Sequence, residues 1–182
     1  MAVAEQLRLF VAVELPPGVR AALAGLQREL RPRCGAGVRW VDAKGIHLTL
    51  KFLGGVEGAR VPPVQAAVEQ AASGQAAFRL SLGSTGFFPN PRRPRVFWVG
   101  IEGEVERLGA LARRVEAALS PLGFPPEGRP FAPHLTLARL GEGMAPPHLE
   151  AFGRLAQATP WQPGHPFTVD GVNLMRSQLT PQ

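Results

Sequence analysis

The chain has 182 residues, of which 45% are hydrophobic, and this composition is typical of one folded domain or of two small lobes that share a core. No apolar run reaches the roughly 18 residues that a membrane span needs, and the start lacks the features of a secretory signal, so we expect a cytoplasmic protein. The single cysteine, Cys34, excludes an internal disulfide and a cysteine-rich metal site. A net charge of +6 suits a polyanionic partner, although a coding bias toward arginine is a competing explanation.

Hydrophobic periodicity predicts alternating strands and helices in the first half of the chain. The apolar run at 7–14 is typical of a strand and ends before two prolines. The following segment, 17–31, carries apolar residues at helical spacing and predicts an amphipathic helix. The other elements expected here are strands at 38–41, 46–53 and 77–83 and a helix at 62–73.

The second half continues the alternation. The proline-rich segment TGFFPNPRRP predicts a loop before a strand at 95–101, and an apolar face predicts a helix over 103–120. The remaining expected elements are strands at 131–140 and 167–175 and a short helix at 146–157. Strands and helices that alternate with short connections indicate an α/β or α+β chain. No strand is followed by a glycine-rich phosphate loop.

An internal repeat links the two halves. Residues 47–54 read HLTLKFLG and residues 134–141 read HLTLARLG, 87 positions later. Six of the eight residue types recur at the same offsets. Repetition at half the chain length suggests duplication of one αβ unit within a single two-lobed domain spanning residues 1–182.

Strand geometry predicts which side chains of the repeat lie together. Residues two apart point to the same face of a strand, so His47 and Thr49 project together, as do His134 and Thr136. The leucines between them point to the core. Two such faces turned toward each other would form a cleft with one imidazole and one hydroxyl on either wall.

This arrangement fits displacement at phosphorus. One histidine can take a proton from water while the other protonates the leaving oxygen on the opposite side. Imidazole titrates near neutral pH, so one neutral and one protonated ring can coexist, and threonine hydroxyls can donate to phosphate oxygens. We expect no metal and no cofactor.

Other interpretations of the repeat stay open. A single His-x-Thr in a strand is more often structural than catalytic, and two histidines could hold a metal if a third ligand lay nearby. A binding module that keeps the pocket without turnover is a further alternative. His148 and His165 lie outside the repeat and are expected on the surface.

The paired motifs resemble those of the two-histidine phosphoesterase superfamily, and within it the RNA 2′,3′-cyclic phosphodiesterases historically named 2′-5′ RNA ligases. Five segments occur in the order of that family. They are RLFVAVELP at 8–16, WVDAKGIHLTLKFLG at 40–54, PRRPRVFWVG at 91–100, FAPHLTLARL at 131–140 and LMRSQLTP at 174–181.

The resemblance implies an α+β fold of two pseudo-symmetric αβ lobes, with antiparallel sheets flanking a central cleft. It implies hydrolysis of RNA 2′,3′-cyclic phosphate ends or cyclic nucleotides to 2′-phosphates, with possible ATP-independent 2′-5′ ligation. By similarity, His47 is the proton donor and His134 the proton acceptor. We expect a monomer that has RNA as its partner and does not bind a membrane.

Three further residues are expected to contact substrate. Arg139 matches the family arginine that follows the second motif, although in a regular strand it points away from the cleft unless a bulge near Ala138 redirects it. Lys51, four residues after His47, has the right parity for the cleft face. Phe10 lies where the family places an aromatic residue near the base, although a core position competes with that role. Arg92, Arg93 and Arg95 could extend a basic rim.

Overall fold

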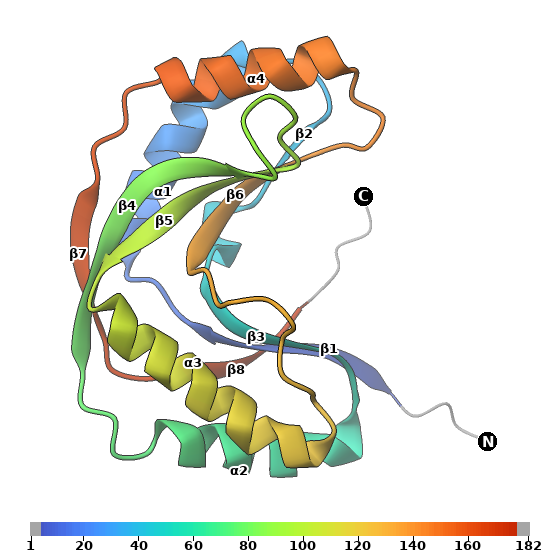
Figure 1. Ribbon diagram of the computed structural model, residues 1–182, viewed down its shortest axis with the longest axis vertical. Helices are drawn as coiled ribbons and strands as arrows, with labels where there is room; N and C mark the ends of the chain where they lie inside the picture. Colours follow the sequence, from blue (N-terminus) through green and yellow to red (C-terminus); the bar gives the residue numbers. More distant parts are fainter. Residues whose placement is uncertain (1–4, 178–182) are drawn as a thin grey trace.

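The structure, a computed structural model, describes residues 5–177 and consists there of two antiparallel sheets covered by four α-helices (Figure 1). Sheet A has the strand order β3-β1-β8, and sheet B has the order β2-β6-β5-β4-β7. The elements in chain order are β1 (Gln6–Val13), α1 (Pro17–Leu30), β2 (Val38–Trp40), β3 (Leu48–Glu57), α2 (Val61–Ala72), β4 (Phe78–Phe88), β5 (Val96–Gly103), α3 (Val105–Leu119), β6 (His134–Leu140), α4 (Pro146–Ala158), β7 (Gly164–Val169) and β8 (Asn173–Arg176).

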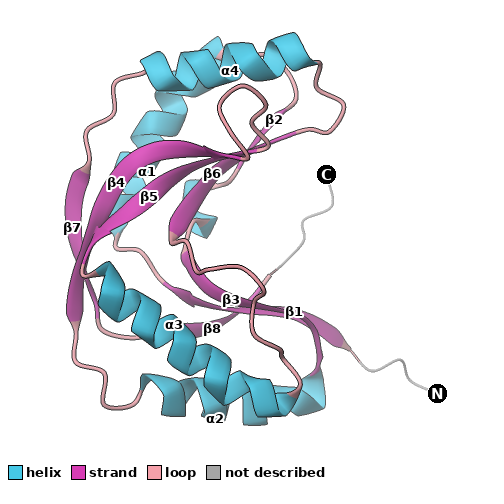
Figure 2. Cartoon of the chain, in the orientation of Figure 1, coloured by secondary structure: helices cyan, strands magenta, loops and turns pink. Residues whose placement is uncertain are grey.

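Each helix buries its apolar stripe on the outer face of a sheet, which leaves the strands on the inside of the molecule (Figure 2). Helices α2 and α3 pack together against sheet A, and α3 contacts β3. Helices α1 and α4 cover sheet B. There, Gln27 of α1 donates to the carbonyl oxygen of Leu137 at 3.0 Å, and Phe152 of α4 meets the ring of Phe97 edge-on. The buried face of each sheet is therefore its helix-covered face.

The α+β class predicted from the sequence is confirmed, but several predicted boundaries are wrong, and two of these errors concern which strands pair. Residues 85–88, expected in a loop, extend β4, because they pair with β5 as far as Phe88 opposite Val96. The strand expected at 167–175 is two strands. The strand conformation is interrupted at 170–172, where the chain passes from sheet B into sheet A. The expected final segment beyond Ser177 lies outside the described residues.

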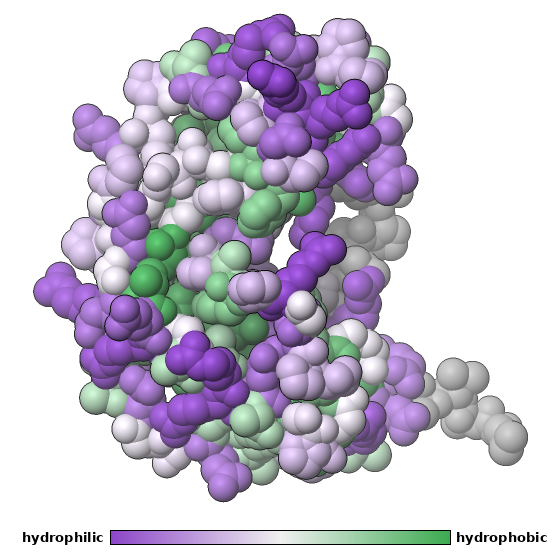
Figure 3. All heavy atoms as spheres, in the orientation of Figure 1, coloured by the Kyte–Doolittle hydropathy of each residue, from purple (hydrophilic) through white to green (hydrophobic). Residues whose placement is uncertain are grey.

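The strands that carry the repeat, β3 and β6, belong to different sheets and approach each other. Some of their residues have Cα atoms within 8 Å across the two sheets. In Figure 1, β6 lies directly above β3, and the space-filling view in Figure 3 shows a hollow between the upper and lower parts of the molecule. The faces of β3 and β6 that the helices leave uncovered border this groove.

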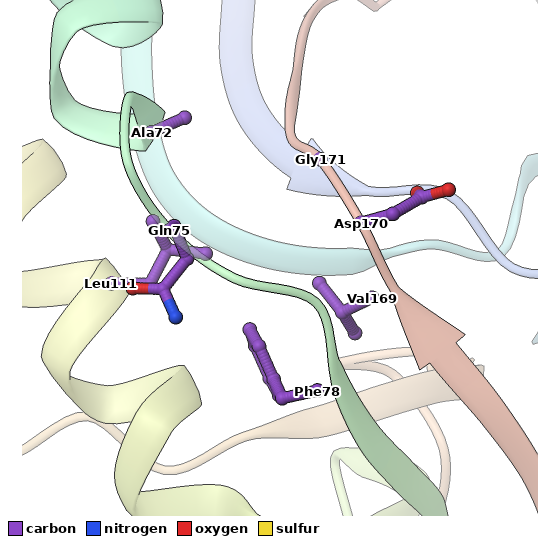
Figure 4. A pocket seen from close by; sticks show the side chains of 7 residues that line it. All are labelled: Ala72, Gln75, Phe78, Leu111, Val169, Asp170 and Gly171. Atoms are coloured by element: carbon purple, nitrogen blue, oxygen red, sulfur yellow. The ribbon is translucent and has the colours of Figure 1, made fainter.

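Away from the groove, a small cavity lies where α2, α3, the start of β4 and the end of β7 meet (Figure 4). Its volume of about 10 Å³ is close to the minimum that one water molecule needs. The residues that line it are Ala72, Gln75, Phe78, Leu111, Val169, Asp170 and Gly171. This cavity is too small for a nucleotide.

No helix between residues 5 and 177 combines the length and apolar character that crossing a membrane demands.

Candidate active site

His47 lies immediately before β3 and is half-buried. Its imidazole stacks on the ring of Phe10 in β1, with 4.4 Å between the ring centroids and 22° between the planes. Burial lowers the pKa of His47 below its ordinary value of 6.5, and a hydrogen bond to the main chain of Gly45 raises this pKa by a smaller amount. The protein without substrate therefore favours the neutral imidazole at neutral pH.

His134 is the first residue of β6 and is also half-buried. Its Nδ1 lies 2.7 Å from the carbonyl oxygen of Ala132. Because a carbonyl oxygen only accepts, Nδ1 carries the proton and Nε2 is the atom left for chemistry. The ring of Phe88 meets the imidazole edge-on at 5.0 Å, and Trp98 lies at 6.2 Å.

The two histidines are held in the same way by the main chain. Gly45 and Ala132 each precede their histidine by two residues, and each carries the carbonyl group that accepts a hydrogen bond from the imidazole. The hydrogen bond fixes the orientation of the ring and, for His134, the tautomer. Both walls of the groove thus orient their imidazoles through backbone atoms, with no carboxylate partner among the described residues.

Thr49 and Thr136 share the faces of their histidines. Each is half-buried, whereas the residues on either side of it are buried on the helix-covered face. These flanking residues are Leu48, Leu50, Leu135 and Leu137. Each wall therefore presents an imidazole and, two residues on, a hydroxyl group, which is the alternation expected of a strand.

A β-bulge follows the first motif. Thr49 lies opposite Ala12 and Lys51 lies opposite Val11, so Leu50 is an additional residue in β3. A bulge places two residues against one and changes which face the following side chains occupy. From Leu50 to a second irregularity at Leu53, the alternation of β3 is consequently reversed.

The second motif contains the same bulge at the same offset. Thr136 lies opposite Trp98 and Ala138 lies opposite Phe97, so Leu137 is the additional residue in β6. A bulge near Ala138 is one interpretation of the sequence, and the structure has it one residue earlier, at Leu137. It turns Arg139 toward the groove, as that interpretation requires. The repeat therefore extends beyond residue types to an irregularity of the backbone.

The bulge contradicts the predicted placement of Lys51. The side chain is only 2% exposed and points away from the His47 face, toward α3. Its Nζ donates to the carbonyl oxygen of Pro125 at 2.7 Å and lies 3.4 Å from the carboxylate of Glu116, which also accepts from the main-chain N–H of Glu127 at 2.8 Å. Lys51 therefore stabilises the segment 120–133 between α3 and β6. Its side chain is not available to substrate in the groove.

The same bulges bring Phe52 and Arg139 onto the groove faces. Each stands five residues after its histidine, and each is exposed, Phe52 to 63%. The sequence pattern indicates Arg139 as a candidate but does not indicate Phe52. Alignment of the two copies could have found it, because a bulge that redirects Arg139 implies the same for the residue at the matching offset.

Phe10 is the second substrate contact that the structure changes. Its ring is 6% exposed, with His47 stacked on one side and Phe52 at 6.2 Å. With only 6% of its surface exposed, the ring leaves too little open area for a base to stack on. Phe10 thus supports His47, and the aromatic surface open to a base on this wall belongs to Phe52.

Trp98 forms part of the other wall beside His134. A Cβ atom at Gly86 would come within 2.2 Å of the indole ring, so only glycine lets the ring lie across β4. The indole Nε1 is buried without a hydrogen-bond partner in the described part of the chain. The ring therefore contributes a flat apolar surface next to the imidazole.

The other candidates lie apart from the two motifs. His148 and His165 are exposed, on α4 and β7, and Arg92 and Arg93 are exposed in the loop after β4. Between residues 5 and 177, no three His, Cys, Asp or Glu side chains are grouped as a metal ion requires. Of the candidates named from the sequence, those on the groove faces are the imidazoles of His47 and His134, the hydroxyls of Thr49 and Thr136 and the guanidinium of Arg139.

Comparison with known proteins identifies this arrangement. The family model described as LigT-like phosphoesterase matches the chain twice, over residues 13–98 and 99–182. An RNA 2′,3′-cyclic phosphodiesterase of Methanothermobacter thermautotrophicus is 33% identical over 177 residues, which cover 97% of this chain and 92% of that protein. A protein of the same name from Thermus thermophilus is 36% identical over 184 residues, with 97% and 84% covered.

Solved structures agree with the sequence comparison. The crystal structure of a Thermus thermophilus protein superposes with a TM-score of 0.75 at 36% identity and covers 96% of this chain and 90% of that one. Escherichia coli LigT complexed with 3′-AMP superposes with a TM-score of 0.74 at 26% identity, with 97% and 91% covered. Two antiparallel sheets that each present a His-x-Thr strand to one groove are the arrangement of a two-histidine phosphoesterase. The chain belongs to the LigT-like phosphoesterase family.

Proposed function

We propose that the protein hydrolyses the 2′,3′-cyclic phosphate at an RNA end and leaves a 2′-phosphate. The observation that carries the proposal is the pair of half-buried imidazoles, each oriented by the carbonyl group two residues before it, on two strands that approach within 8 Å. The names of the relatives support the substrate, since several are RNA 2′,3′-cyclic phosphodiesterases.

In the proposed reaction, His134 accepts a proton from water at Nε2, and the water oxygen attacks phosphorus. The bond from phosphorus to O3′ breaks on the opposite side, and His47 gives its proton to O3′. The products are a 2′-phosphate and a 3′-hydroxyl. Thr49 and Thr136 donate hydrogen bonds to the non-bridging phosphate oxygens, where negative charge accumulates in the transition state.

The donor role of His47 requires substrate. Burial lowers the pKa of this histidine, so the unliganded protein holds it largely neutral at pH 7. A bound phosphodiester carries a negative charge, and a negative charge close to an imidazole favours its protonated form. Substrate binding therefore raises the pKa of His47 and prepares the proton that the leaving oxygen needs.

Phe52 and Arg139 supply the contacts beyond the phosphate. Nucleobases at RNA ends are unstacked and bind well to exposed aromatic rings. Phe52 offers such a ring on the same wall as His47. Arg139, at the matching position of the opposite wall, offers a guanidinium that can pair with phosphate or stack on a base.

The test is incubation of the pure protein with an RNA 2′,3′-cyclic phosphate, in the presence of a chelator, across pH 5–9. We expect a 2′-phosphate as the product, detected by chromatography and by its resistance to a 3′-phosphatase. Binding without any product would favour the module that lacks turnover. Activity that disappears with the chelator and returns with zinc or manganese would favour a metal site.

A second RNA with a free 5′-hydroxyl, added to the same assay, tests 2′-5′ ligation, in which that hydroxyl takes the place of water. The cytoplasmic location and the monomeric state stay predictions from the sequence, and the proposed reaction depends on neither.

A further inference from the structure

A pair of arginines occupies the groove face of sheet B beyond the second motif. Arg39 of β2 lies directly opposite Arg139 of β6, so the two side chains project from the same face. Both are exposed. The neighbours of Arg39 and Arg139 along their strands, Trp40 and Ala138, point to the opposite face, where Trp40 packs against Phe152 of α4.

Like charges directly across two strands destabilise a sheet unless an anion lies between them. Neither Arg39 nor Arg139 takes part in an ion pair within residues 5–177, whereas Arg107, Arg154 and Arg176 do. The guanidinium of Arg95 adds to the positive charge at this end of the sheet, because its Nη1 donates to the carbonyl oxygen of Gly141 at 2.8 Å. The fold therefore maintains a concentration of positive charge that no described carboxylate neutralises through an ion pair.

The position of the pair separates it from the phosphate that reacts. With the bulge counted as one step, Arg139 lies four strand positions beyond His134, or about 13 Å at the usual rise of a strand. Arg39 lies one strand further from His134, on β2. A phosphate placed between the two histidines is thus beyond direct contact with Arg39. A longer RNA chain would carry further phosphates along this face.

We propose that Arg39 and Arg139 form a second phosphate subsite, which binds a phosphodiester of the RNA chain on the 5′ side of the cyclic end. The inference rests on the proposed function, because it takes the reacting end to lie at the histidines. The subsite makes the enzyme selective for oligonucleotides over cyclic mononucleotides, since only an oligonucleotide reaches both places.

The test compares kcat/KM for a short RNA with a 2′,3′-cyclic end and for the matching cyclic mononucleotide. We expect the wild type to prefer the oligonucleotide by about 10-fold or more, as one additional charge-assisted phosphate contact allows. Arg39→Gln should remove most of this preference by lowering kcat/KM for the oligonucleotide. The slope of log(kcat/KM) for the oligonucleotide against log[salt] should become shallower by about 0.7 in this variant.

Two variants serve as controls. Arg113→Gln removes the same charge from the exposed surface of α3, on the far side of sheet A, and should keep the preference. Arg39→Lys keeps the charge and should retain part of the preference for the oligonucleotide. Arg39→Gln should melt at a temperature no lower than that of the wild type, because it relieves a like-charge pair.

Loss of activity by Arg39→Gln in equal proportion on both substrates would overturn the subsite, and so would an unchanged preference. If the wild type opens neither substrate, the proposed function fails, and a binding assay then decides the subsite separately. Anisotropy of a labelled RNA with a plain 3′-hydroxyl should show weaker binding by Arg39→Gln than by Arg113→Gln. Equal affinity of the two variants would reject the subsite.

Discussion

The two walls of the groove are alike where each strand begins and different where it continues. Sheet A presents His47, Thr49 and then Phe52, whereas sheet B presents His134, Thr136 and then Arg139. The offsets are the same, and so is the bulge that turns the last of these residues toward the groove. The aromatic ring on one side thus corresponds to a guanidinium on the other.

This difference follows the shape of the proposed substrate. The phosphate is nearly symmetric, with one oxygen entering and another leaving, so equivalent groups can serve it from both sides. The rest of an RNA end is not symmetric, because a base lies on one side and a charged chain continues on the other. The positions that carry the same residue type on both walls can therefore act on phosphorus. The position that differs, Phe52 on one wall and Arg139 on the other, can recognise what is attached to the phosphate.

The largest expected effect is the loss of kcat/KM when either histidine is removed. This experiment also tests whether one histidine acts as the acid and the other as the base. His47→Ala and His134→Ala should each lower kcat/KM on a cyclic phosphate by at least about 100-fold, the scale of a positioned acid or base. On a 4-nitrophenyl phosphodiester, whose leaving group departs without a proton, His47→Ala should recover most of its loss and His134→Ala should not.

The exposed His148 of α4 supplies the control, and His148→Ala should leave both rates unchanged. Recovery by His134→Ala in place of His47→Ala would reverse the assignment of acid and base. Near-normal turnover by either active-site variant would remove that histidine from the mechanism.

A smaller loss of kcat/KM is expected at Phe52, which has a different residue type, Arg139, at the equivalent position of the other wall. Phe52→Ala should lower kcat/KM for a cyclic nucleotide about 10-fold, within the range measured for loss of one base-stacking contact. Phe52→Trp should keep most of the activity. The difference between wild type and Phe52→Ala should disappear with ribose 2′,3′-cyclic phosphate, which has no base. An equal deficit on that sugar would mean that Phe52 acts on the phosphate or on the fold.

The smallest effect concerns stability. Because burial lowers the pKa of His47, the folded protein binds this proton less readily than the unfolded chain does. The free energy of unfolding should therefore fall as the pH drops from above 6.5 through the lowered pKa, and His47→Gln should reduce that fall. Urea unfolding at pH 8 and pH 5 measures the difference. Parallel loss of stability in the two proteins would mean that His47 is not the group responsible.

The sequence predicts well which side chains of the two motifs share a face, because the His-x-Thr spacing depends only on strand alternation. It fails at Lys51 and Phe52 for a physical reason. Regular alternation would bury Phe52 and expose Lys51, which agrees with their polarity, but the bulge at Leu50 does the reverse. The burial of Lys51 is made possible by Glu116, a residue 65 positions away, and such a partner leaves no local pattern.

The fold class was equally accessible from periodicity, whereas the allocation of strands to sheets was not. The stretch at 167–175 is continuous in its β-prone composition, and only the three-dimensional path shows that β7 ends sheet B and β8 enters sheet A. Likewise, residues 85–88 look like part of a proline-rich loop until β5 is available to pair with them.

The pairing of β1 with β8 has a consequence for the newly synthesised chain. One edge of β1 is completed by β3 early in translation, but the other must wait for a strand that begins at Asn173. Until then the nascent protein presents an open backbone edge that can pair with other chains. We therefore expect ribosome-bound intermediates that end before Asn173 to depend on chaperones.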